Sequence, residues 1–239
     1  MDTRLDIERA YTFIFKDPKW FEKIAVAAFL TLTFIGSPAV YGWVMEIQKR
    51  VQDGSEDDTL PEWKDLGEYF IDGLKLMVIN FIWFLPFTLL YFVIMIPFYI
   101  LPLFPVLAEE AEGIVVVFTM LGAFLPFMLM PFIMVTSFLM YAILPLIAGS
   151  YLENREFSEG FNFKRVFALL KANFWILLAA SFLGYIASYF LSMVGMVLCF
   201  IGIFLISPIA MAIMFHFFGQ AYRISKIKLE AKNAAEEPA

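Results

Sequence analysis

The stretch that decides the fold reads ANFWILLAASFLGYIASYFLSMVGMVLCFIGIFLISPIAMAIMFHFFGQAY (residues 172–222). It contains no Asp, Glu, Lys or Arg. About 20 apolar residues in a helix cross the hydrocarbon core of a bilayer, so this stretch is long enough for two membrane spans. We expect a turn near Gly195 to Gly202, with spans over 172–195 and 199–222.

Two further stretches, from Leu76 to Ala108 and from Gly113 to Leu152, are equally free of charge. The whole chain is 62% hydrophobic and only 17% charged, against about 45–50% and about 25% in soluble domains. These values predict an all-α integral membrane protein forming one membrane domain over 1–239.

The two central spans are expected over 76–107 and 114–150, separated by an acidic loop at Glu109–Gly113. As one straight helix the second would be about 55 Å long, well beyond a core of about 30 Å. Kinking, tilt or an extension outside the membrane must absorb the excess. The alternative is a span plus a short hairpin around Pro126–Pro131.

Amphipathic segments precede the apolar stretches. Residues 1–20 predict an interfacial helix with a capping box at Thr3 and Asp6. Residues 59–75 predict a second interfacial helix, with its cap at Thr59. We expect the tail, 223–239, to be flexible.

Short patterns recur along the chain. Lys16–Trp20 and Lys171–Trp175 share the spacing K-x-x-x-W, and Lys75–Trp83 is a longer version of it. Phe34–Pro38 (FIGSP) resembles Phe204–Pro208 (FLISP). The pattern predicts about three repeats of an amphipathic helix followed by an apolar hairpin.

The 17 Lys and Arg residues fall in four places, 1–23, 49–75, 155–171 and 223–232. If 24–45 crossed the membrane, the first two places would lie on opposite faces. Either five or twelve of the basic residues would then violate the tendency of Lys and Arg to remain in the cytoplasm.

A half-penetrating hairpin over 24–45 avoids this conflict. If the chain returns at Gly36-Ser37-Pro38, all the basic residues are cytoplasmic, and each arm is about 11 residues or roughly 17 Å long. We therefore expect this re-entrant hairpin, then four transmembrane helices, in the cell membrane with both termini cytoplasmic. Five spans with the N-terminus outside is the alternative.

Few residues indicate chemistry. His216 is the only histidine and has no acidic neighbour within its span, which favours a structural role over proton relay. The acidic loop that begins at Asp53 would need glycine and glutamate as the sixth and twelfth residues of a calcium-binding loop, but Asp58 and Lys64 stand there. We expect no catalytic residue, cofactor or metal.

The remaining candidate residues are structural. Candidate structural or pore positions are Gly36, Ser37, Pro38, Ser207, Pro208 and His216. Trp20, Trp63, Trp83 and Trp175 are the expected anchors at the membrane interface. Small or polar residues on one face of the third span predict close helix packing within or between chains: Ser181, Gly184, Ser188 and Ser192.

The charge balance limits the function classes. A net charge of −6 argues against nucleic acid as a partner. The absence of charged residues inside the spans disfavours ion-coupled transport. The expected partners are membrane lipids and either a partner membrane protein or a second copy of the chain.

Three segments carry a resemblance to a known family. They are Asp17-Pro-Lys-Trp20, Asp53-Gly54 with Leu60-Pro-Glu-Trp63, and Phe70-Ile-Asp-Gly-Leu-Lys75. The chain resembles the membrane family called domain of unknown function 4013. The resemblance implies a bacterial or archaeal polytopic membrane protein, and it transfers no catalytic residues because the family has no assigned activity.

The leading hypothesis is a non-enzymatic accessory or scaffold subunit, or a lipid-organising protein. It rests on the lack of catalytic motifs and of charges within the spans. The alternative is a passive channel or permease for a small solute through proline-broken helices.

Overall fold

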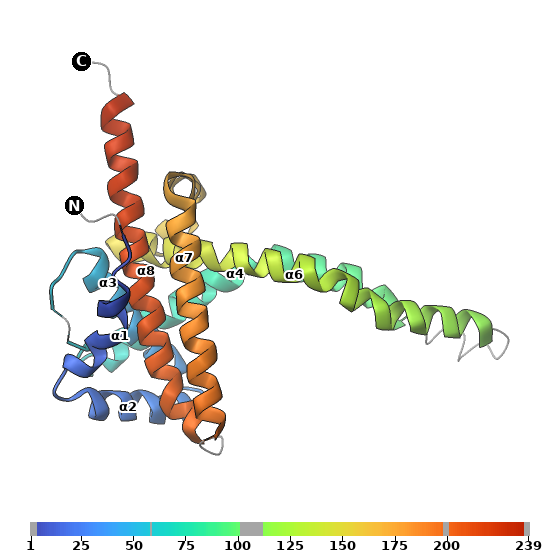
Figure 1. Cartoon of the computed structure of the whole chain (residues 1–239), viewed down its shortest axis with the longest axis horizontal. Coiled ribbons are helices and arrows are strands. Elements are labelled where there is room, and N and C mark those ends of the chain that lie inside the picture. Colours follow the sequence, from blue (N-terminus) through green and yellow to red (C-terminus); the bar gives the residue numbers. More distant parts are fainter. Residues whose placement is uncertain (1–3, 58, 101–111, 198–200, 237–239) are drawn as a thin grey trace. The chain divides into compact units, whose positions relative to one another are not determined.

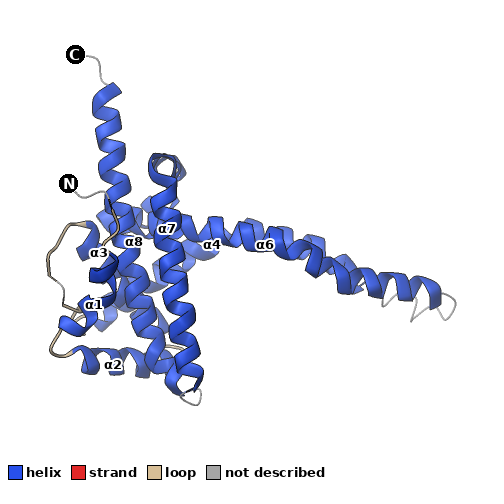
Figure 2. Ribbon diagram, viewed as in Figure 1, coloured by secondary structure: helices blue, strands red, loops and turns tan. Residues whose placement is uncertain are grey.

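The computed structural model describes residues 4–57, 59–100, 112–197 and 201–236. Within these ranges every regular element is a helix, which confirms the predicted all-α fold (Figure 2). The elements in chain order are α1 (Ile7–Lys16), α2 (Trp20–Leu32), α3 (Ser37–Gln52), α4 (Leu66–Ile100), α6 (Glu112–Asn154), the 3₁₀ helix η1 (Phe157–Phe161), α7 (Phe163–Val197) and α8 (Ile201–Glu236).

Four helices in the described part of the chain are long and apolar enough to cross a membrane. These stretches are Leu66–Ile96, Thr119–Asn154, Phe163–Val197 and Gly202–Ala235. The four predicted transmembrane helices are therefore confirmed by length and composition, and the chain has the make-up of a membrane protein.

The chain forms two compact units, one of residues 1–79 with 138–239 and one of residues 80–137. In the first, α7 packs along α8, and α1, α2 and α3 also contact α8 (Figure 1). Large aromatic side chains fill the core of this unit: Trp43, Tyr151, Tyr222, Phe215, Phe217 and Phe218.

The second unit consists of the apolar ends of α4 and α6. Many of its large apolar side chains are exposed, among them Phe124, Phe127 and Met128, as expected of helices that face lipid. Residues 112–154 form one continuous helix, so the alternative of a hairpin around Pro126–Pro131 is not observed. Most of the predicted acidic loop lies outside the described residues.

The apolar segment 24–45 is broken in its middle. α2 ends at Leu32, and α3 begins at Ser37 with Pro38 in its first turn, where a missing N–H costs no hydrogen bond. Between them Phe34 has a φ of 58°, in the left-handed region. The helix thus breaks where a re-entrant hairpin requires it, while the depth of the hairpin in the membrane stays a prediction.

The two predicted interfacial helices differ from the observed ones. α1 begins at Ile7, and the side chain of Asp6 caps it by accepting a hydrogen bond from Arg9 N at 2.9 Å. Thr3 lies outside the described residues. Residues 59–65 form a loop, and α4 begins only at Leu66 and continues into the apolar stretch, so 59–75 is not a separate helix.

Both C-terminal helices are longer than predicted. α8 continues to Glu236, because the Ala, Glu and Lys residues of the tail favour a helix over the flexible end that we expected. α7 begins at Phe163 and is kinked at Asn173, whose φ and ψ are −152° and 53°. The part after the kink, 174–197, is about 36 Å long and matches one span.

The small-residue face of α7 packs within the chain. Ser181 donates to the carbonyl of Tyr141 at 2.9 Å, and a Cβ on Gly184 would lie 2.9 Å from Met214 of α8. Close packing was predicted there, and these contacts assign it to helices of the same chain. The break before Trp20 and the kink before Trp175 occupy similar places, while the three-fold repeat stays a prediction.

Candidate functional site

A polar cavity lies where α3 and the start of α4 meet the residue that follows α6. It has a volume of about 310 Å³. We call it the charged pocket, and it is lined by Glu46, Arg50, Glu62, Lys64, Asp65, Glu68, Tyr69 and Arg155. All of these residues belong to the first unit.

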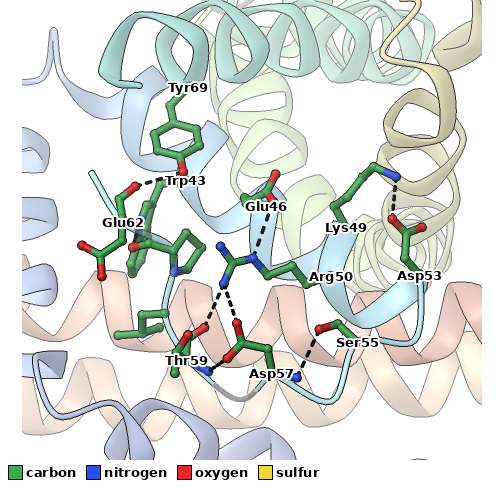
Figure 3. Close-up of polar contacts among 12 residues, drawn as sticks. Trp43, Glu46, Lys49, Arg50, Asp53, Ser55, Asp57, Thr59, Glu62 and Tyr69 are labelled. Carbon is green, nitrogen blue, oxygen red and sulfur yellow. Dashed lines mark hydrogen bonds and ion pairs between the residues drawn. The ribbon is translucent and has the colours of Figure 1, made fainter. Parts of the chain in front are cut away.

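Arg50 joins α3 to the loop that follows it (Figure 3). Its Nε lies 3.5 Å from Glu46 Oε1, and its Nη1 lies 3.6 Å from Asp57 Oδ2. Nη1 also donates to the carbonyl of Thr59 at 3.3 Å. The Arg50 guanidinium therefore connects α3 to the loop that contains Asp57 and Thr59.

Arg155 connects three helices, α3, α4 and α6. It follows α6 with a φ of 55°, which is uncommon for a residue other than glycine. It donates to Glu46 Oε2 at 2.9 Å, to Asp72 Oδ2 at 2.7 Å, and to Glu68 as well. Tyr151 donates to the other oxygen of Asp72 at 2.7 Å, so carboxylates from α3 and α4 converge on the end of α6.

Beside the charged pocket lies a group that we call the Asp17 clamp, made of Asp17, Lys23, Leu60 and Glu62. Lys23 Nζ donates to Asp17 Oδ2 and to the carbonyl of Leu60, each at 2.7 Å, and lies 2.9 Å from Glu62 Oε1. Leu60 N donates to Asp17 Oδ2 at 2.9 Å. The clamp thus ties the α1–α2 junction to the loop before α4.

The side chains of Asp17 and Lys23 are only 2% and 7% exposed. Burial by itself raises the pKa of Asp17, but hydrogen bonds from the Lys23 side chain and from the Lys19 and Leu60 amides outweigh it and lower that pKa. Burial lowers the pKa of Lys23, but hydrogen bonds to Asp17 and Glu62 outweigh it and raise that pKa. Both groups are therefore charged near neutral pH.

Trp43 and Trp63 also connect the segments at this junction. Their rings stack with centroids 5.0 Å apart and planes at 9°. Trp43 Nε1 donates to the carbonyl of Pro61 at 2.9 Å, and Trp63 Nε1 donates to the carbonyl of Lys23 at 3.0 Å. Trp43 is buried and Trp63 is half-buried, so the pair stabilises the loop through ring packing and through hydrogen bonds of both indole N–H groups.

The predicted pore positions lie in different settings. A Cβ on Gly36 would lie 2.6 Å from the carbonyl of Leu30, so Gly36 permits the close return of the α2–α3 hairpin. The carbonyl of Pro38 faces Gly73 of α4. Ser207 donates to Phe204 within its own helix at 3.5 Å, beside Pro208 in the interior of α8.

His216 lies in the contact between α8 and α1. It is buried, its Nδ1 is 3.0 Å from Gln220 Nε2, and its ring centroid is 4.6 Å from that of Phe13. Gln220 Oε1 in turn accepts a hydrogen bond from the backbone of Asp6 at 2.7 Å. The side-chain amide of Gln220 is therefore a neighbour of the histidine ring.

The four predicted anchors differ in exposure. Trp175 is 76% exposed just after the kink of α7, whereas Trp83 is buried in the second unit. Trp20 begins α2 and meets Phe15 edge-on at 5.2 Å. Trp63 belongs to the stacked pair described above.

The charged pocket was not predicted from the sequence. Arg155 and its partner Glu46 are 109 positions apart, and no local pattern brings them together. A signal was nevertheless present in L-P-E-W and D-G-L-K, which are not required by membrane composition. The first supplies Glu62 of the clamp and the pocket, and the second supplies Asp72, which pairs with Arg155. Composition alone could not say that these residues are ion-paired.

The arrangement is suited to holding segments together. In the acidic loop that follows α3, Asp53 pairs with Lys49 at 2.6 Å and Asp57 contacts Arg50. Among the described residues there is no group of three or more His, Cys, Asp or Glu side chains placed to bind a metal. The pocket carboxylates Glu46, Glu62 and Glu68 each contact a basic side chain.

Comparison with known proteins supplies the family. A family profile described as "Protein of unknown function (DUF4013)" matches residues 25–205, well over half of the chain. No curated protein and no solved structure matches the chain. The matched region includes Leu60 and Glu62 of the clamp, and Asp72, which pairs with Arg155 of the pocket. The chain therefore belongs to the DUF4013 family of proteins of unknown function.

Proposed function

We propose that this protein is a non-enzymatic membrane protein that acts as an accessory or scaffold subunit, or in lipid organisation. The observation that carries the proposal is that Glu46, Glu62 and Glu68 of the pocket and Asp17 of the clamp pair with basic side chains. A catalytic site keeps a polar group available for substrate, whereas these four carboxylates join separate segments of the chain. Their arrangement favours a rigid support for the helices.

We also propose that the α2–α3 hairpin enters only one leaflet. The segments before and after it are in contact, because Arg9 Nη2 donates to Ser55 O at 2.8 Å and Lys23 contacts Glu62. A full crossing between them would separate these residues by the core thickness of about 30 Å. Phe34 and Ile35 at the turn are 78% and 80% exposed, which suits a tip in lipid.

This topology places the basic segments on one face. With α2–α3 returning, residues 1–23 and 49–75 lie together, and both termini are cytoplasmic by the distribution of Lys and Arg. The exposed apolar surfaces of the helices are then available to lipid or to a partner helix. A scaffold subunit needs a rigid polar region, such as the charged pocket and the clamp, together with exposed apolar faces that can bind lipid or another helix.

Native purification in lipid nanodiscs, followed by mass spectrometry of all retained molecules, tests the proposal. A second protein at a fixed stoichiometric ratio would support the accessory role and name the process. Retention of one enriched lipid, without a protein partner, would support lipid organisation.

The same preparation tests the alternative of a channel or an enzyme. Solute flux in proteoliposomes above that of empty vesicles would contradict a scaffold role and favour a passive channel. Turnover of a lipid or solute by the purified chain alone would contradict the non-enzymatic assignment.

A further inference from the structure

A second cavity lies between the start of α7 and the end of α8, and it is strongly basic. Its volume is about 670 Å³. The lining residues are Lys164, Phe167, Ala168, Lys171, Ala172, Lys228, Leu229, Lys232 and Asn233. The lining contains four lysines and no carboxylate, and we call this cavity the lysine groove.

The kink of α7 shapes this cavity. Asn173 leaves the helical conformation, and Figure 1 shows the first turns of α7 at an angle to the part that packs along α8. Lys228 Nζ lies 3.5 Å from Asn173 Oδ1, at the kink itself. Lys164 and Lys171 are seven residues apart and so lie on the same side of the first segment.

Two lysines of the groove flank the charge-free stretch of the sequence, where the headgroups of the bilayer are expected. Lys171 directly precedes the charge-free stretch 172–222, and Lys228 follows its end by six residues, which is about 9 Å along a helix. Apolar lining residues, including Phe167 and Leu229, lie next to the lysines. A cavity with cationic and apolar sides at this boundary fits a molecule that is both anionic and apolar.

A neighbouring cavity provides a contrast. It is lined by three arginines, Arg4, Arg9 and Arg223, but Asp6 stands among them and supplies a negative charge. The lining of the lysine groove contains no such carboxylate. Like charges around one cavity repel one another, so an anion that enters it is attracted by lysines of both helices, Lys164 and Lys171 of α7 and Lys228 of α8.

We propose that the lysine groove binds the phosphate-bearing headgroup of an anionic phospholipid, with the apolar lining contacting the first atoms of the glycerol and acyl chains. Basic pockets between membrane helices bind such headgroups in this way. The inference stands on the lysine groove alone and holds whether or not the scaffold role does.

The experiment uses the full chain in detergent micelles doped with phosphatidylglycerol or phosphatidylcholine. Native mass spectrometry measures the lipid-bound fraction at several lipid concentrations. The test variant carries Lys164→Gln, Lys171→Gln and Lys228→Gln, all at exposed positions. The matched control carries Arg4→Gln, Lys16→Gln and Lys19→Gln, which are also exposed and remove the same charge.

We expect the wild type and the control to retain phosphatidylglycerol over phosphatidylcholine. Each lysine near a headgroup contributes roughly a fivefold change, so the test variant should bind phosphatidylglycerol about 100-fold more weakly. Equal losses in both variants would overturn the site, because they would indicate only general charge. Equal retention of the two lipids would overturn it as well.

Inorganic phosphate separates a lipid site from a free-phosphate site. If millimolar phosphate displaces phosphatidylglycerol completely, the lysine groove recognises phosphate alone and the lipid assignment fails. Circular dichroism must show equal helix content in the three proteins. A partner protein found by nanodisc purification leaves this result unchanged, so the two proposals fail independently.

Discussion

Asp17 and Lys23 form a charge pair that is almost fully removed from water. We predict that Asp17→Asn lowers the free energy of unfolding by about 3 kcal/mol, because it leaves the Lys23 charge buried with only the exposed Glu62 as an ionic partner. Chemical unfolding in detergent micelles, followed by tryptophan fluorescence, measures the change.

Two further variants show whether the pair itself is responsible. Glu22→Gln removes an exposed carboxylate from the first turn of α2 and should change stability by less than about 0.5 kcal/mol. Asp17→Asn combined with Lys23→Met should cost less than the two single changes added together. Simple additivity would show that the two side chains act separately.

The same pair makes stability depend on pH in a defined direction. The folded pKa of Asp17 is lowered, so its contribution is complete above the unfolded value of about 4 and is lost as the pH falls through the folded value. The stability gap between wild type and Asp17→Asn should therefore be constant from about pH 5 to 8 and shrink below about pH 4. A gap that widens in acid would contradict this assignment.

Arg155 concentrates three carboxylates on one side chain. Arg155→Gln should lower the free energy of unfolding by about 2 kcal/mol, because Glu46, Glu68 and Asp72 would then repel one another. Arg155→Lys should restore only part of the loss, since an ammonium cannot reproduce the planar fork of the guanidinium. Thermal unfolding of the three proteins at one salt concentration gives the comparison.

At the scale of elements, α3 and α4 approach each other backbone to backbone. A Cβ on Gly42 would lie 1.9 Å from the carbonyl of Tyr69, and one on Gly73 would lie 1.8 Å from the carbonyl of Pro38. Gly42→Ala or Gly73→Ala must therefore force the helices apart. We predict a loss of at least about 3 kcal/mol, or failure to obtain folded protein.

Gly67 supplies the control for these two variants. It lies in the first turn of α4, and a Cβ there would have no atom within 4 Å. Gly67→Ala should leave stability unchanged or raise it by up to about 1 kcal/mol through helix propensity. If all three alanine variants behaved alike in thermal unfolding, the close packing would not explain the glycines.

At the scale of the whole molecule, the proposed half-penetrating hairpin predicts that the segments before and after α2–α3 share one membrane face. With Cys199→Ser as background, Glu8→Cys and Glu56→Cys place one exposed thiol on each side of α2–α3. A membrane-impermeant maleimide applied to intact cells should label neither. Labelling of one but not the other would show that the segment crosses the bilayer and would refute the hairpin.

The sequence predicted elements better than contacts. Charge-free length predicted the helices of 172–222, and the observed ends at Val197 and Ile201 lie within the turn expected near Gly195 to Gly202. It did not predict that α4 starts only at Leu66 or that α8 continues to Glu236. These boundaries depend on loop contacts such as that of Lys23 with Leu60, and on propensities that outweigh the expected fraying.

The sequence alone predicted a membrane protein with four long helices and a return at Gly36-Ser37-Pro38, close to the break observed at 33–36, because bilayer thickness and backbone preference act on local composition. Only the tertiary structure decided that Arg155 joins α3, α4 and the end of α6, and that lysines of α7 and α8 face one cavity. Such contacts join residues that are far apart in the chain. Their geometry depends on how the helices pack, and the order of charged residues along the chain does not specify that packing.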